Sequence, residues 1–126
     1  MTPTLYRQQG LMQQFAANMQ ALTAIRMGQV GQPADALLRA TILQQLAMSL
    51  TNAFPAGSAG EGSRALPAIW TDAAGFQARI AAIQAAAGNL VTAARGTDMA
   101  AVATAQMAMN QTCGACHMAF RGPAPN

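Results

Sequence analysis

The chain has 126 residues, which is enough for one domain around a single hydrophobic core. Apolar residues make up 52% of it and charged residues only 9%, and the net charge of +3 comes from scattered arginines with no lysine. This composition does not favour nucleic-acid binding, and no apolar run approaches the roughly 20 residues that a membrane-spanning helix needs.

Glycines and prolines divide the chain into four segments with helical periodicity. The first is expected over residues 4–30, ending at Gly28 and Gly31. The second begins at Pro33, which suits a first helical turn, and Asp35 is favourable near the positive end of the helix dipole. The apolar face of this second segment is wider than one core stripe needs. That face consists of Leu37, Leu38, Ile42, Leu43, Leu46 and Leu50.

A long loop is predicted over residues 53–71, where glycine and proline are frequent. The third helix then starts at the N-cap signal of Asp72 and ends at Gly96. The fourth is capped by Asp98 together with the threonine before it, and ends at Gly122 and the proline that follows.

The fourth segment has a heptad-like apolar seam, typical of helices that cross at a shallow angle. The seam consists of Met99, Val102, Gln106, Met109, Cys113, Cys116 and Phe120. Because the first and second helices, and the third and fourth, are joined by short turns, the sequence predicts an all-α fold. We expect one domain over residues 1–126, an antiparallel up-down-up-down four-helix bundle.

Near the C-terminus, Cys113 and Cys116 are followed by His117, the CxxCH signature of c-type haem attachment. In this chemistry two thiols add to the two porphyrin vinyl groups and the adjacent imidazole binds iron. On a helix the three residues share one face, as a flat cofactor held from one side requires. The sequence therefore predicts one covalent haem c, near the C-terminal end of the last helix, with His117 as the iron ligand.

Other uses of a CxxC pair explain these residues less well. A redox dithiol usually opens a helix after a strand, whereas this pair closes a helical segment. A structural zinc site needs four ligands, and the chain has no other cysteine or histidine. A disulfide would leave His117 without a role.

In the predicted topology His117 lies at the end of the bundle where the first helix begins. Leu11, Met12 and Phe15 are therefore the residues expected to face it across the haem, with Met48 a weaker candidate. Leu11 and Met12 are about 100° apart on a helix, so only one of them can point at the iron. Periodicity favours Leu11 and an open sixth position, while Met12 as a second ligand would give a low-spin electron carrier.

Two arginines near the same end have possible roles beside a haem. Arg7 stands in a first helical turn, where a cation opposes the helix dipole unless an anion such as a haem propionate compensates it. Arg121 follows His117 by four residues and so shares its face. The positive charge of Arg121 is favourable at a helix C-terminus. Near the imidazole of His117, the same charge would also influence the iron.

The whole set of these features resembles the cytochrome c′ family, and the resemblance covers nearly the whole chain. It is carried by Tyr6-Arg7-Gln8 with Leu11, Phe54-Pro55, Leu66-Pro67-Ala68-Ile69-Trp70, Asp72 to Phe76, and Cys113 to Arg121.

The resemblance implies five-coordinate, largely high-spin haem c with His117 as the proximal ligand. Leu11 falls on the family's distal position, where a bulky apolar side chain shields the vacant face of the iron. Arg7 and Gln8 fall on positions that contact the propionates, and Arg121 on the basic residue beside the proximal histidine.

The resemblance also implies binding of NO and CO with discrimination against O2, and a homodimer through the first two helices. We expect a periplasmic protein whose export signal is not part of this chain, with either NO binding or electron transfer to an unidentified redox partner as its role. Enzymatic activity such as peroxidation is not expected, since it needs distal acid and base groups and the one histidine is already used.

Overall fold

The computed structural model describes residues 3–54, 65, 68–96 and 98–120, and all elements in these ranges are helical. The elements are α1 (Pro3–Arg26), α2 (Asp35–Ser49), the 3-10 turn η1 (Leu50–Asn52), α3 (Ala68–Thr71), α4 (Ala73–Ala94) and α5 (Met99–Phe120). The short helix α3 lies inside the stretch predicted as a loop, which is a correction to the sequence-based expectation.

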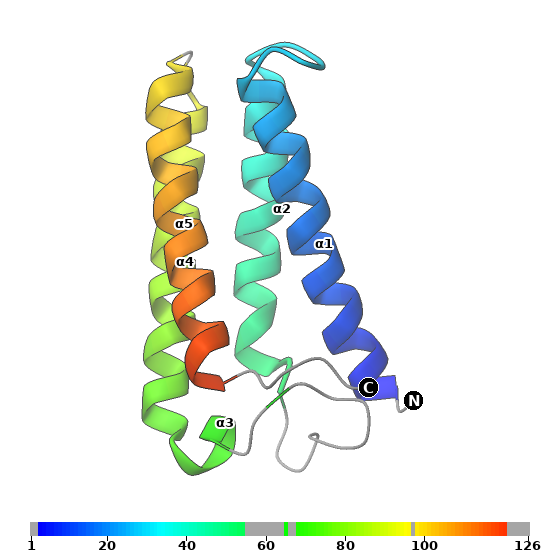
Figure 1. Cartoon of the computed structure of the whole chain (residues 1–126), viewed down its shortest axis with the longest axis vertical. Helices are drawn as coiled ribbons and strands as arrows, with labels where there is room; N and C mark the ends of the chain where they lie inside the picture. Colours follow the sequence, from blue (N-terminus) through cyan, green and yellow to red (C-terminus); the bar gives the residue numbers. More distant parts are fainter. Residues whose placement is uncertain (1–2, 55–64, 66–67, 97, 121–126) are drawn as a thin grey trace.

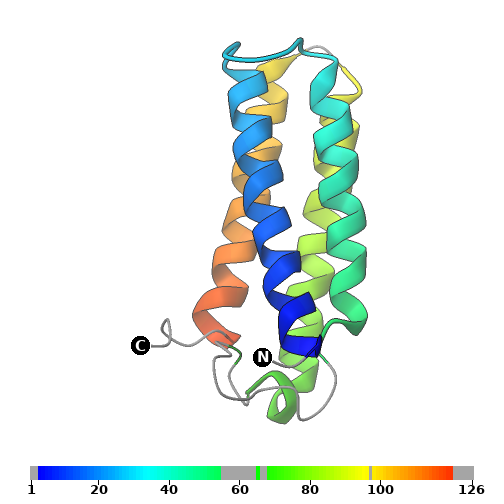
Figure 2. The same cartoon turned by 90° about the vertical axis from the view of Figure 1, so that its right-hand side faces the viewer.

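The four long helices α1, α2, α4 and α5 run alternately up and down (Figure 1), which confirms the predicted antiparallel bundle. α5 packs most closely against α4, and α2 packs against both α4 and α1. Figure 2 shows that α1 begins at the same end of the bundle at which α5 ends. The topology therefore brings the first turns of α1 and the last turns of α5 to one end of the molecule.

The first helix is shorter than predicted because Gly28 ends it. Helix α1 stops at Arg26, and Gly28 takes a left-handed backbone conformation with φ of 74°. Its N–H donates to the carbonyl of Ile25 at 3.1 Å, and the N–H of Gln29 donates to the carbonyl of Ala24 at 2.9 Å. This pair of bonds is the Schellman motif, which satisfies the last carbonyls of a helix but prevents its continuation.

Aspartate side chains lie at the starts of the other long helices. Helix α2 begins at Asp35, two residues after the predicted Pro33. Its N-cap residue Ala34 makes no side-chain capping bond, and the Asp35 carboxylate instead accepts a hydrogen bond of 2.7 Å from the Gln32 N–H. The predicted caps are confirmed at Asp72, which accepts from the Gly75 N–H at 3.2 Å, and at Asp98, which accepts from the Ala100 N–H at 2.9 Å. Each cap satisfies an N–H that the helix itself cannot.

The core is formed by the apolar stripes that the periodicity predicted. Its largest fully buried side chains are Leu22, Leu43, Leu90, Val102 and Met109. Leu38 lies outside this core with 60% of its surface exposed, so the apolar face of α2 is indeed wider than the monomer's core uses. None of the helices in the described ranges is both long and apolar enough to cross a bilayer.

A buried glutamine joins the two helices that carry the expected site. Gln106 of α5 is only 3% exposed, and its Nε2 donates to the Met19 carbonyl at 3.1 Å and to the Thr23 hydroxyl at 2.8 Å. Its Oε1 accepts a bond of 3.0 Å from Nε of Arg26. These bonds satisfy a polar group inside an apolar core, and because they are specific they fix the register of α1 against α5.

Candidate functional site

The three residues of the CxxCH signature lie in the last two turns of α5, a helix that is continuous to Phe120. Cys113, Cys116 and His117 are all half-buried, and both cysteines pack against the hydrophobic core. Their spacing places them on one face of the helix. The described structure therefore presents two thiols and an imidazole together on a partly covered surface.

The thiols are not joined to each other and their surroundings keep them neutral. Burial, and secondarily the neighbouring Cys116, raise the pKa of Cys113 to about 11. Burial also raises the pKa of Cys116, while the Arg79 guanidinium on α4 opposes that effect. At neutral pH both groups are thus protonated thiols, because desolvation penalises the thiolate. Within the described residues, no group of three or more histidine, cysteine or carboxylate side chains could hold a metal ion.

The register set by Gln106 identifies the part of α1 that faces this end of α5. Gln106 bonds to Met19 and Thr23, and His117 lies about three helical turns further along α5. Since the two helices are antiparallel, the same distance back along α1 leads to residues 8–12. The first turns of α1 are therefore the segment opposite His117, as the topology predicted.

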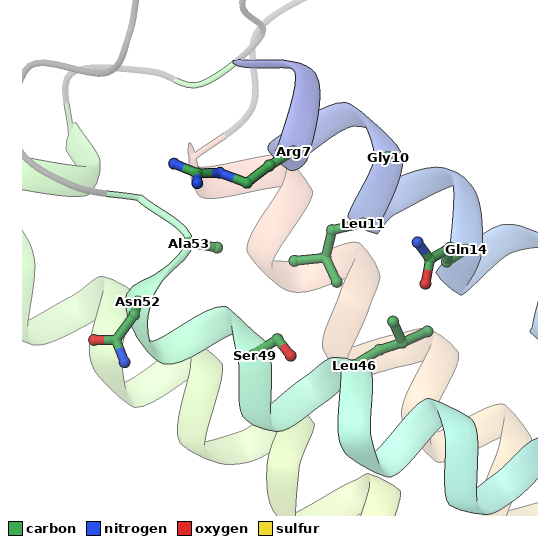
Figure 3. A pocket seen from close by; sticks show the side chains of 8 residues that line it. All are labelled: Arg7, Gly10, Leu11, Gln14, Leu46, Ser49, Asn52 and Ala53. Carbon is green, nitrogen blue, oxygen red and sulfur yellow. The ribbon is translucent and has the colours of Figure 1, made fainter. Parts of the chain in front are cut away.

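A cavity of about 620 Å³ lies beside that segment, between α1 and the end of α2. Its lining residues are Arg7, Gly10, Leu11, Gln14, Leu46, Ser49, Asn52 and Ala53. In Figure 3 the side chains of Leu11 and Arg7 both project from α1 toward the end of α2 and Ala53. The volume falls within the range of roughly 300–1,000 Å³ that is usual for cofactor and ligand sites.

The residues of α1 that were expected at the site lie in different environments. Leu11 and Arg7 line the cavity, whereas Phe15 is buried in the core. Gln8 is 5% exposed, and its Nε2 donates to the carbonyl of Ala53 at 2.9 Å. Met12 is half-buried and packs against the core, but it is not among the residues that line the cavity.

Two other residues named from the sequence do not belong to this arrangement. Met48, the weaker candidate from the second helix, is 60% exposed, so it does not point into the bundle. Arg121 lies outside the described residues.

The structure adds residues that the periodicity did not single out. Ser49, Asn52 and Ala53 line the cavity because α2 continues into the 3-10 turn instead of ending in an extended loop. Arg79 on α4 acts electrostatically on Cys116. A polar or small residue next to a turn carries no distinctive pattern, so only the packing of the helices reveals these positions.

The residues at this end of the bundle fit a covalently held haem. The two neutral thiols and the imidazole share one face of α5, and the opposing helix contributes the leucine and the guanidinium that line the cavity. Arginine suits the carboxylate of a propionate, and no aspartate or glutamate is among the lining residues. The donor set also fits haem better than zinc, because the described residues contain no group of three or more histidine, cysteine or carboxylate side chains that could hold a metal ion.

Comparison with known sequences gives an independent result. The family model described as Cytochrome C′ matches residues 3–121. The chain is 36% identical to cytochrome c-556 of Agrobacterium tumefaciens (strain II Chrys) over 116 residues, which cover 91% of this chain and 93% of the relative. It is also 36% identical to cytochrome c′ of Pararhodospirillum photometricum over 117 residues, which cover 92% of this chain and 93% of the relative.

Solved structures agree with the bundle over nearly all of its length. Cytochrome c′ from Rubrivivax gelatinosus superposes with a TM-score of 0.84 at 27% identity, covering 94% of each chain. The nitric oxide complex of a leucine-to-alanine variant of cytochrome c′ from Alcaligenes xylosoxidans gives 0.85 at 27% identity, and a carbon monoxide-bound leucine-to-glycine variant gives 0.86 at 27% identity. Both cover 95% of this chain and 94% of the other.

Proposed function

The chain belongs to the cytochrome c′ family, and from this membership we propose that it is a periplasmic haem protein that binds NO and CO at five-coordinate iron. Membership confirms haem c as its cofactor, and the CxxCH segment that fits its attachment is Cys113–His117. Two of its structural neighbours, by their descriptions, are complexes with nitric oxide and carbon monoxide. The observation that carries the proposal for this chain is the Leu11-lined cavity on the helix opposite His117.

Each residue of α5 at the site has a distinct task in this proposal. Cys113 and Cys116 would hold the cofactor through two thioethers, and His117 would bind its iron. Bound haem supplies an iron atom whose sixth position can take a small gas molecule. Because all three side chains come from one rigid helix, the imidazole is held in position by the same element that fixes the porphyrin.

Leu11 controls the other side of the iron in this account. A branched hydrocarbon side chain cannot ligate iron, so it leaves the sixth position open while keeping water and larger molecules away. An NO or CO molecule that entered from this side would have to displace the Leu11 side chain. Discrimination against O2 follows because O2 binding gains most from a nearby hydrogen-bond donor, and Leu11 provides none. The cavity also has polar lining residues, Arg7 and Gln14 from α1 and Ser49 and Asn52 from the α2 side.

Arg7 is proposed to bind a haem propionate at the rim of the cavity. Its side chain is exposed and projects toward Ala53 from the second turn of α1 (Figure 3). Pairing with a carboxylate there would offset the unfavourable position of a cation near a helix N-terminus. Gln8 is proposed to contact the propionates as well, and Arg121 is proposed to lie beside His117.

A homodimer through α1 and α2 is also proposed. The exposed Leu38 and Met48 on α2 support it.

The second candidate function is electron transfer by six-coordinate iron with Met12 as the second ligand. It is favoured by the position of Met12, which is half-buried at the level of Leu11 instead of facing solvent. A methionine opposite a histidine is the usual ligand pair of electron-transfer cytochromes c. A Met12→Leu variant separates the two functions. We expect its ferric and ferrous visible spectra to match those of the wild type, whereas a change from low-spin to high-spin spectra would establish Met12 as a ligand.

A further inference from the structure

Gln8 makes a hydrogen bond that connects α1 to Ala53, on the other side of the cavity. Its side-chain amide is 5% exposed, and Nε2 donates to the Ala53 carbonyl at 2.9 Å. Ala53 lines the cavity, and Leu11, which also lines it, follows Gln8 by three residues and so lies on a neighbouring part of the same helix face. One bond therefore ties the turn that precedes Leu11 to a residue on the opposite side of the cavity.

The segment to which Gln8 is tied is itself well anchored. The indole Nε1 of Trp70 on α3 donates to the Phe54 carbonyl at 3.1 Å. The Phe54 ring packs edge-to-face against Phe76 of α4, with 5.3 Å between the ring centroids. Because these contacts hold residues 53–54 to α3 and α4, the Ala53 carbonyl is a fixed point relative to the body of the bundle.

The rest of α1 is attached further from the site. Asn18 accepts a bond of 3.1 Å from Nη1 of Arg39 on α2, and Thr23 accepts from Gln106 on α5. Gln8 provides the corresponding attachment in the first turns of the helix. A helix end that is held in this way resists the small displacement that a side chain such as Leu11 needs in order to move aside.

We propose that Gln8 is a positioning residue that sets how readily Leu11 yields to an incoming gas molecule. The hydrogen bond to Ala53 holds the start of α1 against the fixed end of η1, so that Leu11 stays over the cavity. This inference rests on the proposed function, because it assigns Gln8 a part in controlling access to an open iron site. It assigns the buried amide a second task beside the propionate contact proposed above, carried by its bond to Ala53.

The test compares two glutamine donors, Gln8 on α1 and Gln84 on α4. Gln8 donates to Ala53, just after η1. Gln84 Nε2 donates to the Ala47 carbonyl in α2 at 3.1 Å and to the Thr51 hydroxyl in η1 at 3.0 Å. Gln8→Met and Gln84→Met each keep the length of the side chain but remove the donor. The readout is the rate of CO association with the ferrous holoprotein, measured by stopped flow. We expect about a five-fold increase for Gln8→Met, the factor that corresponds to one net hydrogen bond, and no change for Gln84→Met.

A double-mutant cycle tests whether Gln8 acts through Leu11. In a Leu11→Ala background the leucine side chain is already absent, so Gln8→Met should change the rate of CO association less than two-fold. Gln8→Asn, whose amide is one methylene too short to reach Ala53, provides a second variant if the methionine substitution impairs folding, and it should also accelerate CO binding.

The outcomes separate this inference from the proposed function. A wild-type ferrous protein that does not respond to CO would overturn both. If the wild type binds CO, an unchanged rate in both Gln8 variants would overturn the inference alone. An equal acceleration in Gln84→Met, or a full five-fold effect of Gln8→Met on top of Leu11→Ala, would also overturn it, since either result would mean general loosening of the bundle.

Discussion

Nε2 of Gln106 on α5 donates a hydrogen bond of 2.8 Å to the hydroxyl of Thr23 on α1, and this contact aligns the helix that carries His117 with the helix that carries Leu11. Most of the contact of α5 is with α4, so α1 depends on a few specific interactions for its position along α5. A buried amide defines such a position better than leucines do, because a shifted register would leave it without partners.

Replacing this glutamine should destabilise the fold. Gln106→Leu removes the acceptor of the Arg26 Nε–H and two donated bonds, so we expect the free energy of unfolding to fall by about 1–3 kcal/mol. The measurement is denaturant unfolding followed by circular dichroism. Gln111→Leu, at an exposed position on the same helix, is the matched control and should leave stability within about 0.5 kcal/mol. Equal stabilities of the two variants would contradict the role assigned to Gln106.

Shortening the side chain opposite the iron should open the site. For Leu11→Ala we expect CO to associate with the ferrous protein at least about ten-fold faster, since removing a steric barrier of about 1.4 kcal/mol has that effect. Flash photolysis of the CO complex measures this rate. Gln14→Ala changes another residue that lines the cavity and should leave the rate unchanged. If the two variants behave alike, Leu11 is not the residue over the iron.

Removing the cation at the rim should lower the reduction potential. In the proposed arrangement Arg7 balances a propionate, so Arg7→Gln should favour the ferric state, which carries one more positive charge. We expect a decrease of roughly 10–40 mV, the equivalent of an exposed ion pair of about 0.2–1 kcal/mol. Spectroelectrochemical titration gives the potential. The control variant Arg95→Gln removes an exposed arginine just beyond the end of α4, and it should change the reduction potential less. Equal shifts would mean that only the net charge of the protein matters.

Much of the fold could be predicted from the sequence because its signals are local. Asp72 and Asp98 precede runs of helical periodicity, and each caps the helix that follows it. The sequence predicts the end of α1 four residues beyond Arg26, where the helix ends. Gly28 and Gly31 both signal a stop, and the sequence does not show which of them forms the Schellman motif. The position of Cys113, Cys116 and His117 on one helix face also follows from spacing alone.

The surroundings of the site could be predicted only in part, because they depend on contacts between distant segments. Gln8 bonds to Ala53 and Trp70 bonds to Phe54, and neither pair is related by helical spacing. The difference between Leu11 and Met12 is of the same kind. Both fit the apolar stripe of α1, and only the packing of α1 against α2 shows that Leu11 lines the cavity while Met12 does not.

The coordination state of the iron can be tested directly by one measurement. The visible spectrum of the wild-type ferrous protein is recorded before and after exposure to CO. We predict a high-spin spectrum that CO converts fully to that of a low-spin complex, because Leu11 leaves the sixth position open. A low-spin ferrous spectrum that does not respond to CO would contradict the account and would indicate Met12 bound to iron.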